Sequence, residues 1–96
     1  MKLVISQRAY SDAAKLAQFI ENDLKAKSIS DKYMQGLDNT VEKLSFLASA
    51  IGKNEYVQKM FGEKARHITY KKMAIIFFVE QETIYIQRII ASSLIH

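Results

Sequence analysis

The chain has 96 residues with a formal net charge of +4 at pH 7; 49% of them are hydrophobic, 25% are charged and none is cysteine. This length and composition predict a single globular domain over residues 1–96 and exclude a disordered chain or a disulfide-held scaffold. The moderate positive charge favours an acidic protein segment or nucleic acid as a partner without distinguishing the two.

The amino terminus predicts a short strand. Lys2 to Ser6 is apolar and β-branched at its centre and ends in a polar turn. Gln7 and Arg8 follow at once, so this apolar run predicts neither a signal peptide nor a membrane span. The expected compartment is therefore the cytoplasm.

Two helices are predicted after this strand. The first carries an apolar stripe at helical spacing, and its charged residues are expected mostly on the outside. The stripe comprises Ala13, Leu16, Ala17, Ile20 and Leu24, and the charged set comprises Asp12, Lys15, Glu21 and Asp23. Residues 25–28, with the sequence KAKS, interrupt the stripe, so the first helix is expected to end there.

Ser28 and Asp31 have the spacing of a capping box at the start of the second helix. Its stripe comprises Tyr33, Leu37, Val41, Leu44, Ala48 and Ile51, and Gly52 is the expected stop. The two helices are expected to form an antiparallel hairpin on one face of a sheet. Residues 54–62 show no sustained period and are predicted to form an ordered loop.

Residues 66–90 predict three antiparallel strands. The middle one, residues 73–80, is apolar at almost every position, and Gln81 and Glu82 form a tight turn to the last, residues 83–90. Counting from this turn predicts the cross-strand pairs on one face of the sheet, which are Val79 and Ile84, Phe77 and Ile86, and Ile75 and Arg88. This face is expected to pack against Leu16, Ile20, Val41 and Leu44 of the helices. The pairs Phe78 and Tyr85, Ile76 and Gln87, and Ala74 and Ile89 form the other face.

The element order predicts an α+β fold, in which a strand and a helical hairpin precede three strands and the hairpin covers one face of a mostly antiparallel sheet. Arg88 is predicted among isoleucines on the covered face. Because an unpaired buried charge costs several kcal/mol, we expect an ion pair between Arg88 and a helix acid.

The opposite face is expected to remain exposed and apolar. Its predicted patch comprises Ala74, Ile76, Phe78, Tyr85 and Ile89, flanked by Lys71 and Lys72. Soluble monomers seldom leave such a patch uncovered, so we expect a disordered acidic segment of a partner protein to bind it. Self-association of the chain into a homodimer through the same patch is the expected substitute when the partner is absent.

Common catalytic and metal-binding motifs are absent from the sequence, and neither a metal nor a cofactor is expected. His67 can act as a proton carrier only where cations surround it. The cations that are candidates for such a catalytic site are Arg66, Lys71 and Arg88. The alternative is that His67 is a structural residue and that the cations form a solvated basic edge.

The ordered combination of these elements resembles the RelE/ParE superfamily of type II toxin-antitoxin toxins. The resemblance spans nearly the whole chain, from the opening strand and helical hairpin to Arg66-His67-Ile68, the run AIIFFV and the closing IYIQRII, where Arg88-Ile89-Ile90 matches the family pattern best. It implies a growth-inhibiting toxin of a plasmid-stabilisation module and a small acidic antitoxin as partner, whose carboxy-terminal segment would cover the patch.

The superfamily that the sequence resembles has two functional branches. In the branch that cleaves messenger RNA on the ribosome, strand cations and a carboxy-terminal group act on phosphate, but here Ala74, His67, Thr69 and Ala91-Ser92-Ser93 occupy those positions. The departures favour the non-enzymatic branch, which binds DNA gyrase. A ribosome-dependent nuclease using His67, Arg66, Lys71 and Arg88, or a toxin-like domain without toxicity, remains the alternative.

Overall fold

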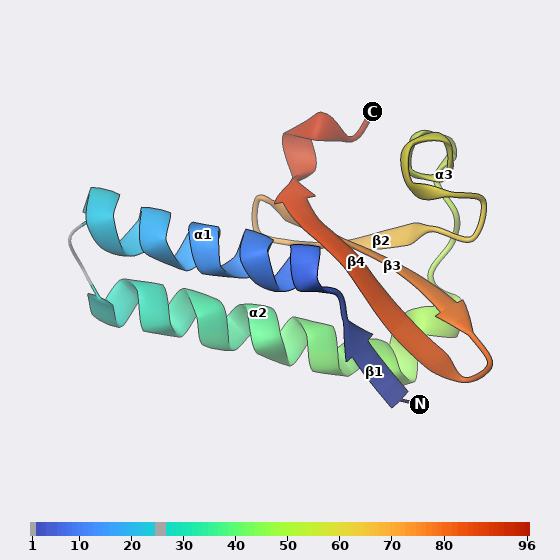
Figure 1. Ribbon diagram of the computed structural model, residues 1–96, viewed down its shortest axis with the longest axis horizontal. Helices are drawn as coiled ribbons and strands as arrows, with labels where there is room; N and C mark the ends of the chain where they lie inside the picture. Colours follow the sequence, from blue (N-terminus) through green and yellow to red (C-terminus); the bar gives the residue numbers. More distant parts are fainter. Residues whose placement is uncertain (1, 25–26) are drawn as a thin grey trace.

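The computed structural model describes residues 2–24 and 27–96. A four-stranded sheet carries a helical hairpin on one face and a short third helix on the other (Figure 1). The elements in chain order are β1 (Lys2–Ile5), α1 (Gln7–Leu24), α2 (Lys27–Leu47), α3 (Glu55–Phe61), β2 (Arg66–Tyr70), β3 (Met73–Glu80) and β4 (Thr83–Ala91), with single 3-10 turns at Ala48–Ala50 and Ser92–Leu94. The strand order is β1-β4-β3-β2, with β1 parallel to β4 and the other pairs antiparallel, which confirms the predicted fold class.

The main core lies between the hairpin and the sheet. The side chains of Ile75, Phe77, Ile84 and Ile86 are buried there and pack with residues of both helices. The helix residues in this core include Ala9, Leu37, Val41 and Leu44, with Leu16 at its margin. The predicted helix-facing side of the β3–β4 hairpin is thus confirmed, although Ile20 is buried outside this core.

The hairpin extends well beyond the sheet, and its far end is held by contacts between α1 and α2 themselves (Figure 1). The Ser30 hydroxyl, which is buried, donates a hydrogen bond of 3.2 Å to the Ala17 carbonyl oxygen. The start of α2 at Lys27 places Ser28 inside the first turn, so the predicted capping position is wrong. The predicted break at Lys25 and Ala26 lies outside the described residues, as do the side chains of Asp23 and Leu24.

A bulge interrupts the pairing of β3 with β4. From the turn, the register follows the prediction through Phe77 and Ile86, but Ile76 then pairs with Arg88 and leaves Gln87 as the extra residue. The predicted pairs of Ile76 with Gln87, Ile75 with Arg88 and Ala74 with Ile89 are therefore wrong. An extra residue in one strand exchanges the faces of everything beyond it, so Ile89 joins the core under the helices. Arg88, predicted on that face, instead pairs with Ile76 on the α3 side of the sheet.

Residues 54–62, predicted to form a loop, contain α3. The Asn54 side chain accepts a hydrogen bond of 3.0 Å from the Val57 amide at the start of this helix, and Gly62 at φ 117° ends it. Seven residues are too few to give a sustained helical period in a sequence. The packing of α3 on the sheet decides how much of the second face is left open.

Candidate functional site

The face of the sheet opposite the hairpin is only partly exposed. Ala74 and Ile76 are fully buried there beneath Val57 of α3 and Ala65. The partly buried residues around this second cluster are Phe61, Ile90 and Ile95. The prediction of one continuous exposed patch is therefore wrong, because α3 and the carboxy-terminal turn cover Ala74 and Ile76 and the bulge moves Ile89 to the other face.

Phe78 and Tyr85 are the part of the predicted patch that remains partly accessible. Their rings stack across β3 and β4, with centroids 4.8 Å apart and planes 12° apart, as their predicted pairing requires. Val4 of β1 pairs with Tyr85, shares this face and is 43% exposed. The three side chains form an apolar row across β1, β4 and β3, which we call the aromatic row.

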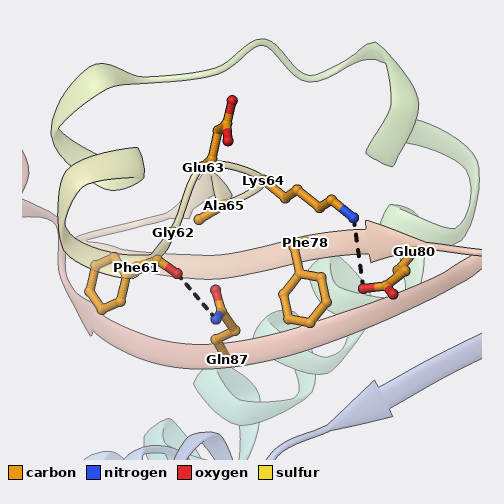
Figure 2. Close-up of a pocket in the computed structure, with 8 residues that line it drawn as sticks. All are labelled: Phe61, Gly62, Glu63, Lys64, Ala65, Phe78, Glu80 and Gln87. Carbon is orange, nitrogen blue, oxygen red and sulfur yellow. Dashed lines mark hydrogen bonds and ion pairs between the residues drawn. The ribbon is translucent and has the colours of Figure 1, made fainter.

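A hollow of about 300 Å³ lies beside Phe78, between the sheet and the segment that follows α3 (Figure 2). Gln87, the bulge residue, projects into it between Phe61 and Phe78 and donates a hydrogen bond of 3.4 Å to the Phe61 carbonyl oxygen. The Gln87 Oε1 atom is buried and accepts no hydrogen bond from the described residues. Lys64 and Glu80 form an exposed ion pair of 3.9 Å at the rim.

Two further hollows continue from this one along α3. One, of about 550 Å³, is lined by Ser6, Arg8, Met60, Phe61, Gln87 and Arg88. The other, of about 360 Å³, is lined by Tyr56, Met60, Phe61, Arg88, Ile90 and Leu94. All three hollows adjoin at Phe61, and we call the three together the α3 groove.

Arg88 forms the predicted ion pair with a helix acid, and that acid is Asp12. The Arg88 Nε and Nη2 atoms donate hydrogen bonds of 2.8 and 3.0 Å to the two Asp12 carboxylate oxygens. The Ile89 amide donates a third, of 2.9 Å. Asp12, predicted to lie mostly outside, turns inward because α1 runs along the edge of β4 beyond the end of β1.

These contacts shift the pKa values of both partners. Burial of the Asp12 carboxyl raises its pKa, but the hydrogen bonds from Arg88 and Ile89 and the charges of Arg88 and Arg8 outweigh burial and leave the pKa below its usual 3.8. The hydrogen bond to Asp12 raises the pKa of Arg88 above its ordinary value. Both groups are therefore charged at neutral pH.

The structure does not bring the four catalytic candidates together. The Arg66 Nη1 atom donates hydrogen bonds of 3.1 Å to the carbonyl oxygens of Ala48 and Ile51, at the end of the helical hairpin. The Lys71 Nζ atom lies 5.4 and 5.6 Å from the ring centroids of Tyr33 and Tyr70. Arg88 is bound to Asp12, so three of the four candidates serve separate structural contacts.

His67 lies on the opposite face of β2 from Arg66, because neighbouring side chains alternate along a strand. Burial lowers the pKa of His67 below its usual 6.5. His67 is therefore neutral at physiological pH. This placement suits a structural side chain better than a proton carrier surrounded by cations.

The sequence carries no direct signal for the α3 groove. Met60, Phe61 and Leu94 belong to no predicted site, and Arg8 marks only the end of the first apolar run. The signal that could have revealed α3 is a strong capping residue, Asn54, with Gly62 eight residues later.

No family model and no curated protein matches this sequence. Among solved structures, the fold is similar to that of a chain from the chromosomal ParDE toxin-antitoxin system of P. aeruginosa, with a TM-score of 0.79 over 95% of each chain and 21% sequence identity. A likeness at this identity establishes the fold. The predicted α+β architecture is thus confirmed over nearly the whole chain.

In the part of the chain that the structure describes, no helix is both long and apolar enough to cross a membrane.

Proposed function

We propose that this chain is the toxin of a type II toxin-antitoxin module, which arrests growth by binding DNA gyrase and is neutralised by a small acidic antitoxin. The observation that carries the proposal is the likeness to a chain of the ParDE system, which extends over 95% of both molecules and leaves no room for a large unrelated insertion. The resemblance of the sequence to the same superfamily supports it independently of the coordinates.

The geometry favours binding over RNA cleavage. A nuclease that acts without a metal needs cations and a proton carrier aimed at one phosphate. In this chain Arg66, Lys71 and Arg88 are held by three different structural partners. A toxin that acts as a binding body needs no such convergence.

The aromatic row is the proposed contact for the antitoxin. Phe78 and Tyr85 offer a flat apolar surface on a chain of net charge +4. An acidic segment with apolar side chains complements this combination, because apolar burial contributes about 25 cal/mol per Å² while charge speeds the encounter.

The test is inducible expression in a bacterial host, alone and together with the acidic protein encoded by an adjoining reading frame. We expect the chain alone to arrest growth and co-expression to restore it. The variant Phe78→Lys with Tyr85→Lys should remain folded and should escape rescue, whereas Lys53→Glu, an exposed change outside the aromatic row, should be rescued like the parent chain. Growth unaffected by the soluble, folded chain would overturn the proposal.

A further inference from the structure

A narrow crevice opens between α1 and α2 on the hairpin side of the sheet. Its volume is about 80 Å³, and its inner wall includes the buried side chains of Leu37, Val41 and Ile86. None of the residues that form the aromatic row or the α3 groove lines it. The crevice is therefore separate from the surface proposed for the antitoxin.

The crevice exists because α1 presents small side chains where it passes α2. Ala9 and Ala13 both line it and lie one helical turn apart on the same face of α1. Their methyl groups leave space that a larger aliphatic side chain would fill. Because the wall around this space is apolar, it offers water few hydrogen bonds and suits an apolar group.

The mouth of the crevice is polar and carries a negative charge. Tyr10 of α1 and Asp38 of α2 are the lining residues with exposed side chains. The Asp38 carboxylate forms no ion pair with residues 2–24 or 27–96, and none of the described lining residues is basic. A carboxylate attracts a cation, and so does the face of a tyrosine ring, whereas an anion would find no partner at this mouth.

We propose that this crevice binds a short, branched primary alkylamine, with its alkyl group against Ala13 and Val41 and its ammonium group between Tyr10 and Asp38. An apolar cavity of about 150 Å³ holds a benzene ring, so a crevice of about 80 Å³ suits a smaller group such as isopropyl. The inference goes beyond the proposed function and does not depend on it, because the crevice is a property of the fold and not of toxicity.

The experiment is a titration of the full chain with isobutylamine at pH 7 and constant ionic strength, followed by the methyl signals of alanine, leucine and valine in carbon-proton correlation spectra. We expect the signals of Ala9, Ala13 and Val41 to shift saturably with a dissociation constant of about 1 to 10 mM, the range open to so small a ligand.

Three further probes separate the alkyl group from the charge. Isobutanol keeps the branched alkyl group without the charge and should bind about fivefold more weakly, the loss expected for an exposed ion pair with a cation-ring contact. Isovalerate reverses the charge, and methylamine removes the branched alkyl group. Neither of these two should give a saturable shift.

Variants of the wall and the mouth locate the site. Ala13→Leu should abolish binding because its side chain fills the crevice, while Ala14→Leu, the same change at an exposed position of the same helix, should leave binding unchanged. Asp38→Asn, also at an exposed position, should weaken isobutylamine binding about threefold and leave isobutanol binding unchanged.

Thermal melting gives a second readout and checks the fold of each variant. A ligand that binds only the folded chain raises the melting temperature, so isobutylamine should stabilise the parent chain and Ala14→Leu but not Ala13→Leu. Ala13→Val makes a smaller change at the same position and takes the place of Ala13→Leu if the leucine variant does not fold.

Four outcomes would overturn the inference. They are the absence of a saturable shift with isobutylamine, equal affinity for isobutylamine and isobutanol, saturable binding of isovalerate, and full binding of isobutylamine to the folded Ala13 variant or to Asp38→Asn. The result is independent of the growth assay, because arrest of growth by the chain and binding of the amine are measured separately.

Discussion

Asp12 connects α1 to β4 through three hydrogen bonds to one side chain. Its carboxylate binds Arg88 and accepts the Ile89 amide, so it supplies an acceptor to β4 where β1 no longer runs alongside it. Ser6 serves the same edge, because its hydroxyl donates a hydrogen bond of 2.8 Å to the Gln87 carbonyl oxygen and accepts one of 3.0 Å from the Ala9 amide. The start of α1 thereby replaces a strand at the edge of the sheet.

The variant Asp12→Asn should be less stable at neutral pH and less sensitive to acid. The pKa of Asp12 is lowered in the folded chain, so its contribution to the free energy of unfolding is present above about pH 4 and disappears as the pH falls through the folded-state pKa. Urea unfolding should show a loss of about 1 to 3 kcal/mol at pH 7 that shrinks toward pH 2. Asp31→Asn, at an exposed position, is the control. Equal acid sensitivity of Asp12→Asn and the parent chain would contradict this role.

Gly36 provides space for an aromatic side chain of the sheet. Any Cβ atom at this position would collide with the Tyr70 hydroxyl and ring. That hydroxyl donates a hydrogen bond of 3.1 Å to the Tyr33 carbonyl oxygen, and the two tyrosine rings meet edge to face at 5.1 Å. The close approach of α2 to β2 therefore requires glycine.

Gly36→Ala should destabilise the chain by about 1 to 3 kcal/mol, although alanine is the better helix former by about 1 kcal/mol. Thermal unfolding measures the loss. The same change in a Tyr70→Phe background, which removes the nearest colliding atom, should cost less. A Gly36→Ala chain that is as stable as the parent would show that Tyr70 does not constrain this position.

At the scale of elements, the turn between β3 and β4 carries a conformational cost. Gln81 and Glu82 have φ values of 49° and 61°, a left-handed pair that Asn-Gly adopts more readily. Replacing them with Asn and Gly should raise stability by about 0.5 to 1 kcal/mol. Gln81→Val, whose β-branched side chain opposes this φ, should lower it. If calorimetry gave the reverse order of melting temperatures, the left-handed turn would be refuted.

The elements that were predictable from sequence have strong local signals. The apolar stripes of α1 and α2 repeat over several turns, and the two polar residues at 81–82 lie between two apolar runs. The bulge at Gln87 has no such signal, because a single extra residue in an apolar strand does not visibly break the pattern of polar and apolar residues. This one residue decided the faces of Arg88 and Ile89.

The candidate site was less predictable than the fold for the same reason. The pairing of Phe78 with Tyr85 lies before the bulge and follows the prediction, whereas Ile89 lies beyond it and changes face. Ala74 and Ile76 are on the predicted face but are covered by α3. The ion pair of Arg88 with a helix acid followed from the cost of burying a charge, but its partner Asp12 required the path of α1 along β4.

At the scale of the whole molecule, the two faces of the sheet differ in what covers them. The hairpin packs on one face, and α3 with the carboxy-terminal turn covers Ala74 and Ile76 on the other (Figure 1). The aromatic row and the α3 groove lie side by side on that second face, since Phe78 belongs to both. A partner that covered both would contact the apolar side chains of the row and the arginines of the groove.

A toxin that binds gyrase is expected to stop DNA replication first, whereas one that cleaves messenger RNA is expected to stop protein synthesis first. The most direct measurement is the incorporation of labelled thymidine and labelled methionine in the first minutes after induction of the chain, compared with induction of His67→Ala. We expect thymidine incorporation to fall first and His67→Ala to be equally toxic. An earlier fall in methionine incorporation that His67→Ala abolishes would contradict a binding mechanism and identify a ribosome-dependent nuclease.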